Sequence, residues 1–376
     1  MKLTKLFNSF FESEKAGGLI LLVCTAFSLL ISNSAIAQNY FDIWHYPIAN
    51  HSFEYWINDG LMAIFFLMIG LELEREVYKG ELSKIKDAIL PLSGALGGML
   101  FPALIFLLFN FGTKTQSGIG IPMATDIAFA LGILSLVGKN VPNSLKVFLT
   151  ALAVIDDLGA IIVIALFYTK TLFLTNLLIS LSIFGGLLIL NRMKVYNLWI
   201  YLVAGVFMWY FMLSSGVHAT ITGVLLAFAI PFQDGSEKSI SYKLQHFLHK
   251  PVNFIILPLF ALCNTAIVIG SDWINNFTEP YSLGIILGLA VGKPLGIFLF
   301  TFTAVALGLT QLPKDLNWIK IIGVGALAGI GFTMSIFITL LAFDDNAIIN
   351  NAKFMILAAS FLSGIIGFLF FKVKKA

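Results

Sequence analysis

The stretch "VFLTALAVIDDLGAIIVIALFY", residues 147–168, is an apolar run with two formal charges, Asp156 and Asp157, side by side at its centre. As a helix rising ~1.5 Å per residue, it would just cross the hydrocarbon core of a bilayer. An Asp at the centre of a membrane helix costs about 2.5–3.5 kcal/mol on insertion scales. Neighbours on a helix point about 100° apart, so the two carboxylates cannot both face lipid without a large cost in free energy. Neither has a basic partner nearby in the sequence. The pair therefore indicates a function.

The composition outside this run is that of a membrane protein. The 376 residues are 59% hydrophobic and 11% charged, whereas soluble domains carry about 25% charged residues. We expect one polytopic membrane domain over residues 1–376, and the two cysteines lie in apolar runs without a disulfide or metal-ligand spacing. Twelve apolar runs approach bilayer length: 14–33, 57–76, 88–110, 119–137, 147–168, 171–191, 196–213, 217–232, 251–270, 282–306, 318–342 and 353–371.

The distribution of Lys and Arg predicts the orientation of these spans. With both termini cytoplasmic, 19 of the 23 basic residues fall in cytoplasmic segments, as the positive-inside rule requires. The external segments hold Lys114, Lys170 and Lys353, and the remaining basic residue, Lys293, falls inside span ten. The bias predicts that both ends lie inside the cell; with the family resemblance given below, it implies the inner (plasma) membrane of a bacterium.

Other ionisable residues lie within or near the predicted spans. A charged residue within a membrane span is a functional candidate by default, which applies to Asp126 in span four and Lys293 in span ten. Residues near the ends of span two can instead reach the interface, and Glu72 can pair with Arg75 at i, i+3. This end group comprises Asp59, Glu72, Glu74, Arg75 and Glu76.

Two spans carry helix-weakening residues. "SGIGIPMATDIAFALGI" (117–133) places two glycines and Pro122 just before Thr125 and Asp126, and "VGALAGIGFTMSIFI" (324–338) has a glycine-rich centre. Close helix packing also uses glycines, so the second stretch alone is a modest signal. Two interrupted spans roughly 200 residues apart, in corresponding positions of two halves, indicate a transporter ion site at mid-membrane.

Five motifs carry a family resemblance. "ATDIAFALGIL" (124–134), "ALAVIDDLGAIIVIALFYT" (151–169), "SGVHATITGV" (215–224), "GKPLGI" (292–297) and "GIGFTMSIFI" (329–338) resemble, in order and spacing, the NhaA family of sodium/proton antiporters. The similarity runs from about residue 57 to residue 345.

The resemblance implies a fold. It implies an all-α integral membrane protein of about 12 transmembrane helices, with inverted-topology repeats whose interrupted spans four and eleven cross at mid-membrane. The implied ion-transport core repeats are 88–168 and 282–371, and the interface or scaffold helices are 1–87 and 171–270. The aromatic segment 34–56 would be a periplasmic loop, or a β-hairpin that joins two protomers of a homodimer; an interfacial aromatic belt is the alternative.

The resemblance also implies roles for the membrane-embedded residues. Asp156 and Asp157 would form the ion and proton site, with Asp157 the more direct Na⁺ ligand and Thr125 beside them. Asp126 would balance the N-terminal dipoles of the interrupted helices. Lys293 would face their opposite, negative ends and pair with Asp156.

The remaining implied roles concern access and pH response. One position departs from the family: Gln245 stands where the family's pH-sensing stretch has a glutamate, so the pH threshold or steepness is open. The residues assigned to access funnels and pH response are Asp59, Glu72, Arg75, Glu76, His218, Lys243, His246 and His249.

The physics of the acid pair predicts exchange. Burial and a like-charged neighbour both favour the protonated form of a carboxylic acid, so the pair should titrate as a coupled unit near neutral pH. Na⁺ (or Li⁺) prefers hard oxygen ligands, so it would compete with H⁺ for the same carboxylates. Exchange with more than one proton per sodium would move net charge. The two aspartates, and the Asp156–Lys293 pair, are competing assignments for the protons.

Other classes fit less well. The chain lacks the G-x-G-D signature of intramembrane aspartyl proteases around its membrane aspartates, and no loop repeat suggests a channel filter. We expect no enzyme activity, no cofactor and no nucleic-acid partner; the expected partners are Na⁺, Li⁺, H⁺ and the lipid bilayer. A sodium-coupled solute symporter is the alternative that stays open.

Overall fold

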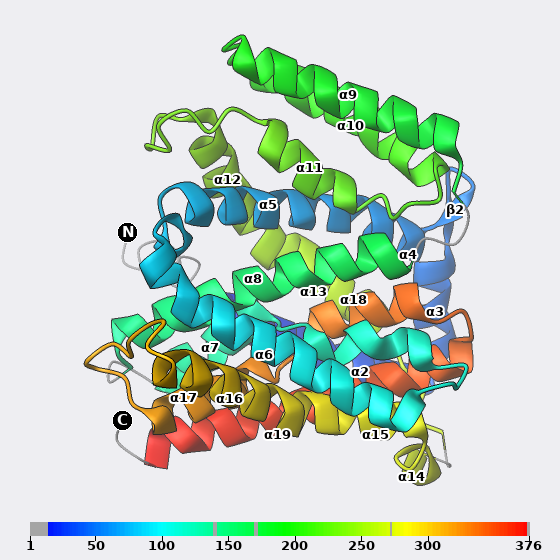
Figure 1. Ribbon diagram of the computed structural model, residues 1–376. Helices are drawn as coiled ribbons and strands as arrows, with labels where there is room; N and C mark the ends of the chain where they lie inside the picture. The colour runs from blue at the N-terminus through cyan, green and yellow to red at the C-terminus, as the bar shows by residue number, and fades with distance from the viewer. Residues whose placement is uncertain (1–13, 138–140, 169–171, 271–272, 374–376) are drawn as a thin grey trace, which may run out of the picture. The chain divides into compact units, whose positions relative to one another are not determined.

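The computed structural model describes residues 14–137, 141–168, 172–270 and 273–373 (Figure 1). Within them, eight helices are long and apolar enough to cross a membrane, and the number rises to ten if each of two bent pairs is one span. Expected span seven is the shorter apolar helix α10, and span eight holds only the nine-residue helix α11. The chain is therefore a mostly helical protein with eight to ten candidate spans. Lys170 and the basic residues of 1–13 and 374–376 lie outside the described residues.

The described residues form two units. The first takes residues 14–41, 84–160 and 261–373, and the second takes 42–83 and 161–260. Three helices contain the boundaries: α3 (Ala37–His45), α8 (Asn143–Phe167) and α13 (Leu257–Asn264). Helix α2 falls in the first unit, where it packs on α7. The repeats expected at 88–168 and 282–371 stay a prediction.

The first unit is built from apolar helices joined by short breaks. Its helices are α2 (Glu14–Ser32), α6 (Ile85–Asn110), a 3-10 helix (Gln116–Met123), α7 (Ile127–Val137), α14 (Trp273–Asn276), α15 (Pro280–Leu287), a π-helical turn (Gly288–Gly292), α16 (Lys293–Ala306), α17 (Trp318–Ala328), α18 (Phe332–Ala342) and α19 (Asn346–Val373).

The second unit contains the one strand pair that the described residues form. Its elements are β1 (Pro47–Ile48), β2 (His51–Ser52), α4 (Phe53–Tyr55), a π-helical turn (Trp56–Leu61), α5 (Met62–Tyr78), a 3-10 helix (Glu81–Ser83), α9 (Leu174–Arg192), α10 (Leu198–Ser214), α11 (Ile221–Ala229), α12 (Ile240–Pro251) and a second π-helical turn (Val252–Ile256).

Glycine contacts set the packing within each unit. In the first unit α6 lies along α16 (Figure 1), and a Cβ on Gly97 would lie 2.1 Å from the carbonyl oxygen of Gly296. In the second unit a Cβ on Gly223 of α11 would lie 2.2 Å from the carbonyl oxygen of Ala63 in α5. Only glycine allows these backbones to approach so closely, as is common between membrane helices.

Two chain breaks lie close together in the first unit. The 3-10 helix, which contains Pro122, ends at Met123; Ala124 is extended, and residues 124–126 have no regular structure before α7 begins. Residues 329–331 separate α17 from α18, which are bent by 49°. The main-chain amide of Asp126 donates to the carbonyl of Ile330 over 2.7 Å, so the two breaks are hydrogen-bonded to each other.

A wider helical turn precedes Lys293. Residues Gly288–Gly292 form a π-helical turn, and α16 then begins at Lys293, followed by Pro294. Turns of this kind are rare and occur often at functional sites. The turn has a glycine at each end, Gly288 against Pro122 and Gly292 against Pro102. A Cβ at either position would meet the proline, so glycine makes room for this backbone.

The aromatic segment 34–56 contains more regular structure than a loop. It holds the nine-residue helix α3 and a hairpin of two two-residue strands, β1 and β2. Ala49 and Asn50 at the tip have φ of 48° and 69°, the positive values that two-residue hairpin turns require.

Candidate functional site

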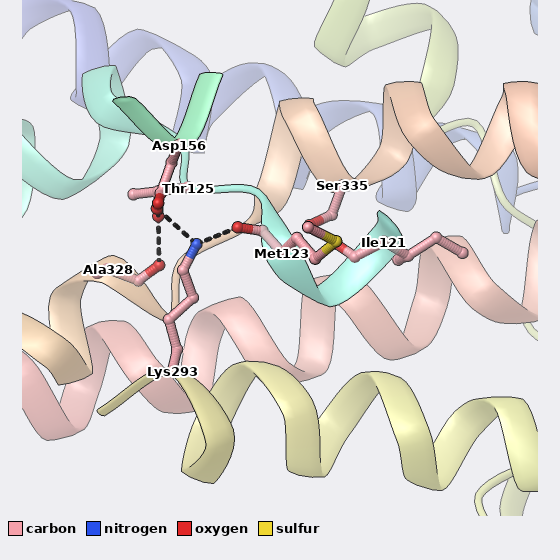
Figure 2. A network of polar contacts seen from close by, with 7 residues as sticks. All are labelled: Ile121, Met123, Thr125, Asp156, Lys293, Ala328 and Ser335. Atoms are coloured by element: carbon pink, nitrogen blue, oxygen red, sulfur yellow. Dashed lines mark hydrogen bonds and ion pairs between the residues drawn. The ribbon is translucent and has the colours of Figure 1, made fainter. Parts of the chain in front are cut away.

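A buried ion pair lies at the centre of the first unit. The Lys293 ammonium of α16 is 2.7 Å from Oδ2 of Asp156 in α8, and both side chains are fully enclosed (Figure 2). Removing two charges from water costs several kcal/mol per ion, so such a pair needs further hydrogen bonds to persist. Lys293 has one: its ammonium also donates to the carbonyl of Met123.

The second partner of Lys293 is a helix end. Met123 is the last residue of the 3-10 helix, whose final carbonyls have no partner within that helix. The C-terminal end of a helix carries partial negative charge, so it favours a cation. Lys293 therefore bridges a carboxylate and the negative end of a helix.

Thr125 connects the acid to a second helix end. Its hydroxyl lies 2.8 Å from Oδ2 of Asp156 and 3.0 Å from the carbonyl oxygen of Ala328, the last residue of α17. A hydroxyl has one proton to donate, so it serves one of these acceptors at a time. Figure 2 shows the hydroxyl between the two.

The other carboxylate oxygen of Asp156 is differently placed. Oδ1 is buried and has no hydrogen-bond partner among the described residues. Asp157 is next along α8 and only 1% exposed. Asp156 thus keeps a free acceptor oxygen beside the ammonium, and a second buried acid follows it on the helix; carboxylates so placed can accept a proton or a small cation.

Asp126 joins the starts of two helices. Its Oδ1 accepts from the amide of Phe129 in the first turn of α7 over 2.9 Å, and Oδ2 accepts from the amide of Thr333 in α18 over 3.1 Å. The Thr333 hydroxyl also donates to Oδ2, over 2.5 Å. A carboxylate at two positive helix ends balances both dipoles.

Replacing Asp126 by Asn should loosen this junction. The amide keeps one acceptor oxygen and turns an N–H₂ toward backbone donors, so the free energy of unfolding should fall by about 2–4 kcal/mol. The measurement is the thermal unfolding midpoint of the full chain in detergent. Asp345→Asn is the matched control, because Asp345 accepts from the Ala347 amide at an exposed helix start, where Asn caps equally well. Equal midpoints for the two variants would contradict the assignment.

The expected funnel and pH residues belong to the second unit. Asp59 is in the first π-helical turn, and Glu72, Arg75 and Glu76 are partly buried on α5. Nε2 of His218, before α11, is 3.1 Å from the carbonyl oxygen of Tyr168. Lys243, His246 and His249 are exposed on α12.

Gln245, where the resemblance implies a departure from the family, connects two of these residues. Its Oε1 lies 3.4 Å from Nη1 of Arg75, and its side chain is also hydrogen-bonded to Glu72. The Arg75 guanidinium stacks 4.7 Å above the ring centre of Tyr242. An amide can accept from the arginine and donate to the carboxylate, which a glutamate cannot do when ionised.

Gln245→Glu should alter the pH dependence of any transport by this chain. The new carboxylate would add a titratable group between Arg75 and Glu72, bonding the arginine and repelling the glutamate once ionised. We expect a steeper or shifted dependence of rate on pH, measured as ion-driven proton movement in vesicles. Gln245→Ala, which removes the bridge without adding a charge, is the control. Identical pH curves for parent and Gln245→Glu would refute this role.

Sequence reasoning placed Lys293 at the negative helix ends but did not say which main-chain carbonyls belong to the site. The carbonyls of Met123 and Ala328 accept from Lys293 and Thr125, yet every residue has a carbonyl and only a chain break frees it. Thr333, which bonds to Asp126, was not singled out from the stretch 324–338. Ser335 likewise donates to the carbonyl of Ile121 over 2.7 Å.

Membrane-length apolar helices around a buried carboxylate–ammonium pair, at the ends of short helices, are typical of secondary transporters. The family model described as Na⁺/H⁺ antiporter 1 matches residues 8–371. The chain belongs to the NhaA family of Na⁺/H⁺ antiporters.

Similar proteins extend over the whole chain. The Na(+)/H(+) antiporter NhaA of Flavobacterium psychrophilum is 70% identical over 98% of this chain and 96% of its own length. The Na(+)/H(+) antiporter NhaA 1 of Flavobacterium johnsoniae is 64% identical over 99% of this chain and 98% of its own length. The NhaA antiporter of Cytophaga hutchinsonii is 59% identical over 99% of this chain and 96% of its own length.

Proposed function

We propose that the chain is a secondary active transporter that exchanges cytoplasmic Na⁺, or Li⁺, for external H⁺ and so regulates intracellular pH and sodium. The observation that carries the proposal is the enclosed Asp156–Lys293 pair, bonded to Thr125 and to a helix end. The names of the relatives support the same activity.

Competition for oxygen atoms supplies the coupling. Na⁺ would bind to the carboxylates of Asp157 and Asp156, with the Thr125 hydroxyl and freed carbonyls completing its shell. Within the described part of the chain no three His, Cys, Asp or Glu side chains cluster as a metal site, which suits a mixed, weak shell. A proton on the acids removes the charge that holds Na⁺, so the two ions bind in turn. Alternating exposure of the site to each side converts this competition into exchange.

Lys293 offers a route to net charge movement. When Na⁺ approaches Asp156, the ammonium loses its partner and is disfavoured in an enclosed site, so it can release a proton. A second proton comes from Asp157, giving more than one proton per sodium and an electrogenic cycle. In the competing assignment both protons come from the two aspartates, and Lys293 stays charged.

The proposed membrane arrangement follows the sequence. About twelve spans would form two inverted repeats, 88–168 and 282–371, whose interrupted spans cross at mid-membrane. Both termini would face the cytoplasm of a bacterium, in its inner membrane, and the hairpin within 34–56 would join two protomers. The funnel and pH-response assignments cover Asp59, Glu72, Arg75, Glu76, His218, Lys243, His246 and His249.

Everted membrane vesicles test the proposal directly. Adding Na⁺ or Li⁺ to vesicles with a respiration-generated acid interior should raise the interior pH, whereas vesicles lacking the protein should not respond. A sodium-coupled solute symporter, the alternative, would respond to Na⁺ only together with an organic solute. Failure of both cations to move protons at any pH would overturn the exchange activity.

A further inference from the structure

The second unit contains an apolar cavity that has no part in the exchange chemistry. Its volume is about 510 Å³, within the range of small-molecule and acyl-chain sites. It lies among α5 with its preceding π-helical turn, α10 and α11. None of the proposed ion-binding residues lines it.

One face of each helix forms the wall. Trp56, Gly60, Ile64 and Leu67 line the cavity at helical spacing along one continuous membrane-length segment, Phe53–Tyr78. At ~1.5 Å per residue, Trp56 to Leu67 spans about 16 Å, close to half of a ~30 Å hydrocarbon core. The cavity therefore has the length of one leaflet.

Two tryptophans mark the end of the cavity nearest the hairpin. The rings of Trp56 and Trp209 lie 6.3 Å apart and both line the cavity. The Trp56 indole donates to the Ile48 carbonyl of β1 over 2.9 Å, and the Trp209 indole lies 3.4 Å from the Asp59 carbonyl oxygen. Tryptophans typically lie at the level of lipid headgroups, so this end is at the interface.

The wall of the cavity carries little polar surface. It is formed by apolar side chains, three glycines, the indoles of Trp56 and Trp209, and Thr222. Thr222 is only 2% exposed and its hydroxyl has almost no accessible surface, so the hydroxyl lies behind the wall. An acyl chain, which has no polar atoms along its length, suits such a surface.

The surrounding sequence determines which lipid fits. Residues 34–74 and 195–226, which contain every cavity residue, hold no Lys or Arg. A cationic side chain is what selects an anionic headgroup, so these segments do not favour one. On the open side Val206 is 65% exposed, within a membrane-embedded helix.

We propose that this cavity binds one acyl chain of a phospholipid without net charge, drawn from the leaflet on the hairpin side. The chain lies along Gly60, Ile64 and Leu67, with the ester group beside the two tryptophans. The site is independent of ion exchange.

Native mass spectrometry of the full chain, delipidated in detergent and supplied with dioleoyl-phosphatidylethanolamine, tests this site. The parent should retain one lipid per chain. Gly60→Leu should weaken retention about tenfold by filling the cavity, because a Cβ there meets nothing nearer than a Trp56 ring carbon at 3.7 Å. Gly185→Leu on α9, where a Cβ meets nothing within 4 Å, is the matched control.

The outcomes separate the alternatives. Parent-like retention by Gly60→Leu would overturn the site. Stronger retention of phosphatidylglycerol than of phosphatidylethanolamine would overturn the headgroup assignment. A second measurement uses no variant that fills the cavity. It compares two single-tryptophan variants in phosphatidylglycerol vesicles that contain a minor fraction of chain-brominated phosphatidylethanolamine: one keeps only Trp209, and the other keeps only Trp199, which is 74% exposed on the same helix. The fluorescence of Trp209 should be quenched more than that of Trp199. Stronger quenching of Trp199 would show ordinary surrounding lipid and refute the proposal.

Discussion

Asparagine at position 157 should reduce Na⁺-driven proton movement at least about 100-fold, equivalent to about 2.7 kcal/mol. The change leaves the volume of the side chain almost intact but removes both the charge that binds Na⁺ and the group that takes a proton. Asp156→Asn should abolish exchange equally. The measurement is the Na⁺-evoked pH change in everted vesicles carrying equal amounts of each variant, with the exposed Asp345→Asn as control.

The two asparagine variants should differ in stability. Asp156→Asn leaves the fully enclosed Lys293 without its anion, whereas Asp157→Asn leaves the 2.7 Å pair in place. Asp156→Asn should therefore lower the thermal unfolding midpoint further than Asp157→Asn does. Normal exchange by either variant would remove the site assignment, and a parent-like midpoint for Asp156→Asn would refute the role of the ion pair.

Lys293→Met should have the second large effect. It leaves the enclosed carboxylate of Asp156 unpaired, which costs about 3–5 kcal/mol of stability when a buried pair is broken from one side. The loss should be larger at alkaline than at mildly acidic pH, because protonated Asp156 needs no counter-charge. Thermal unfolding at both pH values measures this, and the double variant with Asp156→Asn should recover part of the loss, as a double-mutant cycle shows.

The same variant discriminates between the two proton assignments. If Lys293 carries one of the protons, Lys293→Met should exchange ions without moving net charge, and collapsing the membrane potential should leave its rate unchanged. If both protons come from the aspartates, the variant should remain electrogenic.

For the stability prediction, a loss in Lys293→Met that does not depend on pH would contradict the pairing of Lys293 with the Asp156 carboxylate.

The membrane class and the acids could be predicted from the sequence because charges are conspicuous inside apolar runs. Asp126, Asp156 and Lys293 were identified in this way, and the family membership is confirmed by the matched model. The funnel and cavity residues of the second unit carry weaker signals. Glu72 near a span end has an ordinary interfacial explanation, and Trp56 reads as part of an aromatic belt.

The parts of the fold that could not be predicted depend on contacts between distant segments. The hydrogen bond between the Asp126 amide and the Ile330 carbonyl joins residues about 200 positions apart, and a hydropathy pattern carries no such pairing. Nine-residue α11 was expected as a longer span because apolar residues continue past its end at Ala229. The helix α3 within 34–56 was hidden by aromatic residues that suit a strand equally well.

The π-helical turn Gly288–Gly292 determines where the Lys293 ammonium points. Such a turn holds one residue more than an α-helical turn, so tightening it would rotate everything beyond it by about 100° around the helix axis. The lysine would then leave Asp156, and Gly296, which lies beyond the turn, would lose its close contact with Gly97 on α6. The position of the cation is therefore tied to a glycine contact between two packed backbones about one helical turn away.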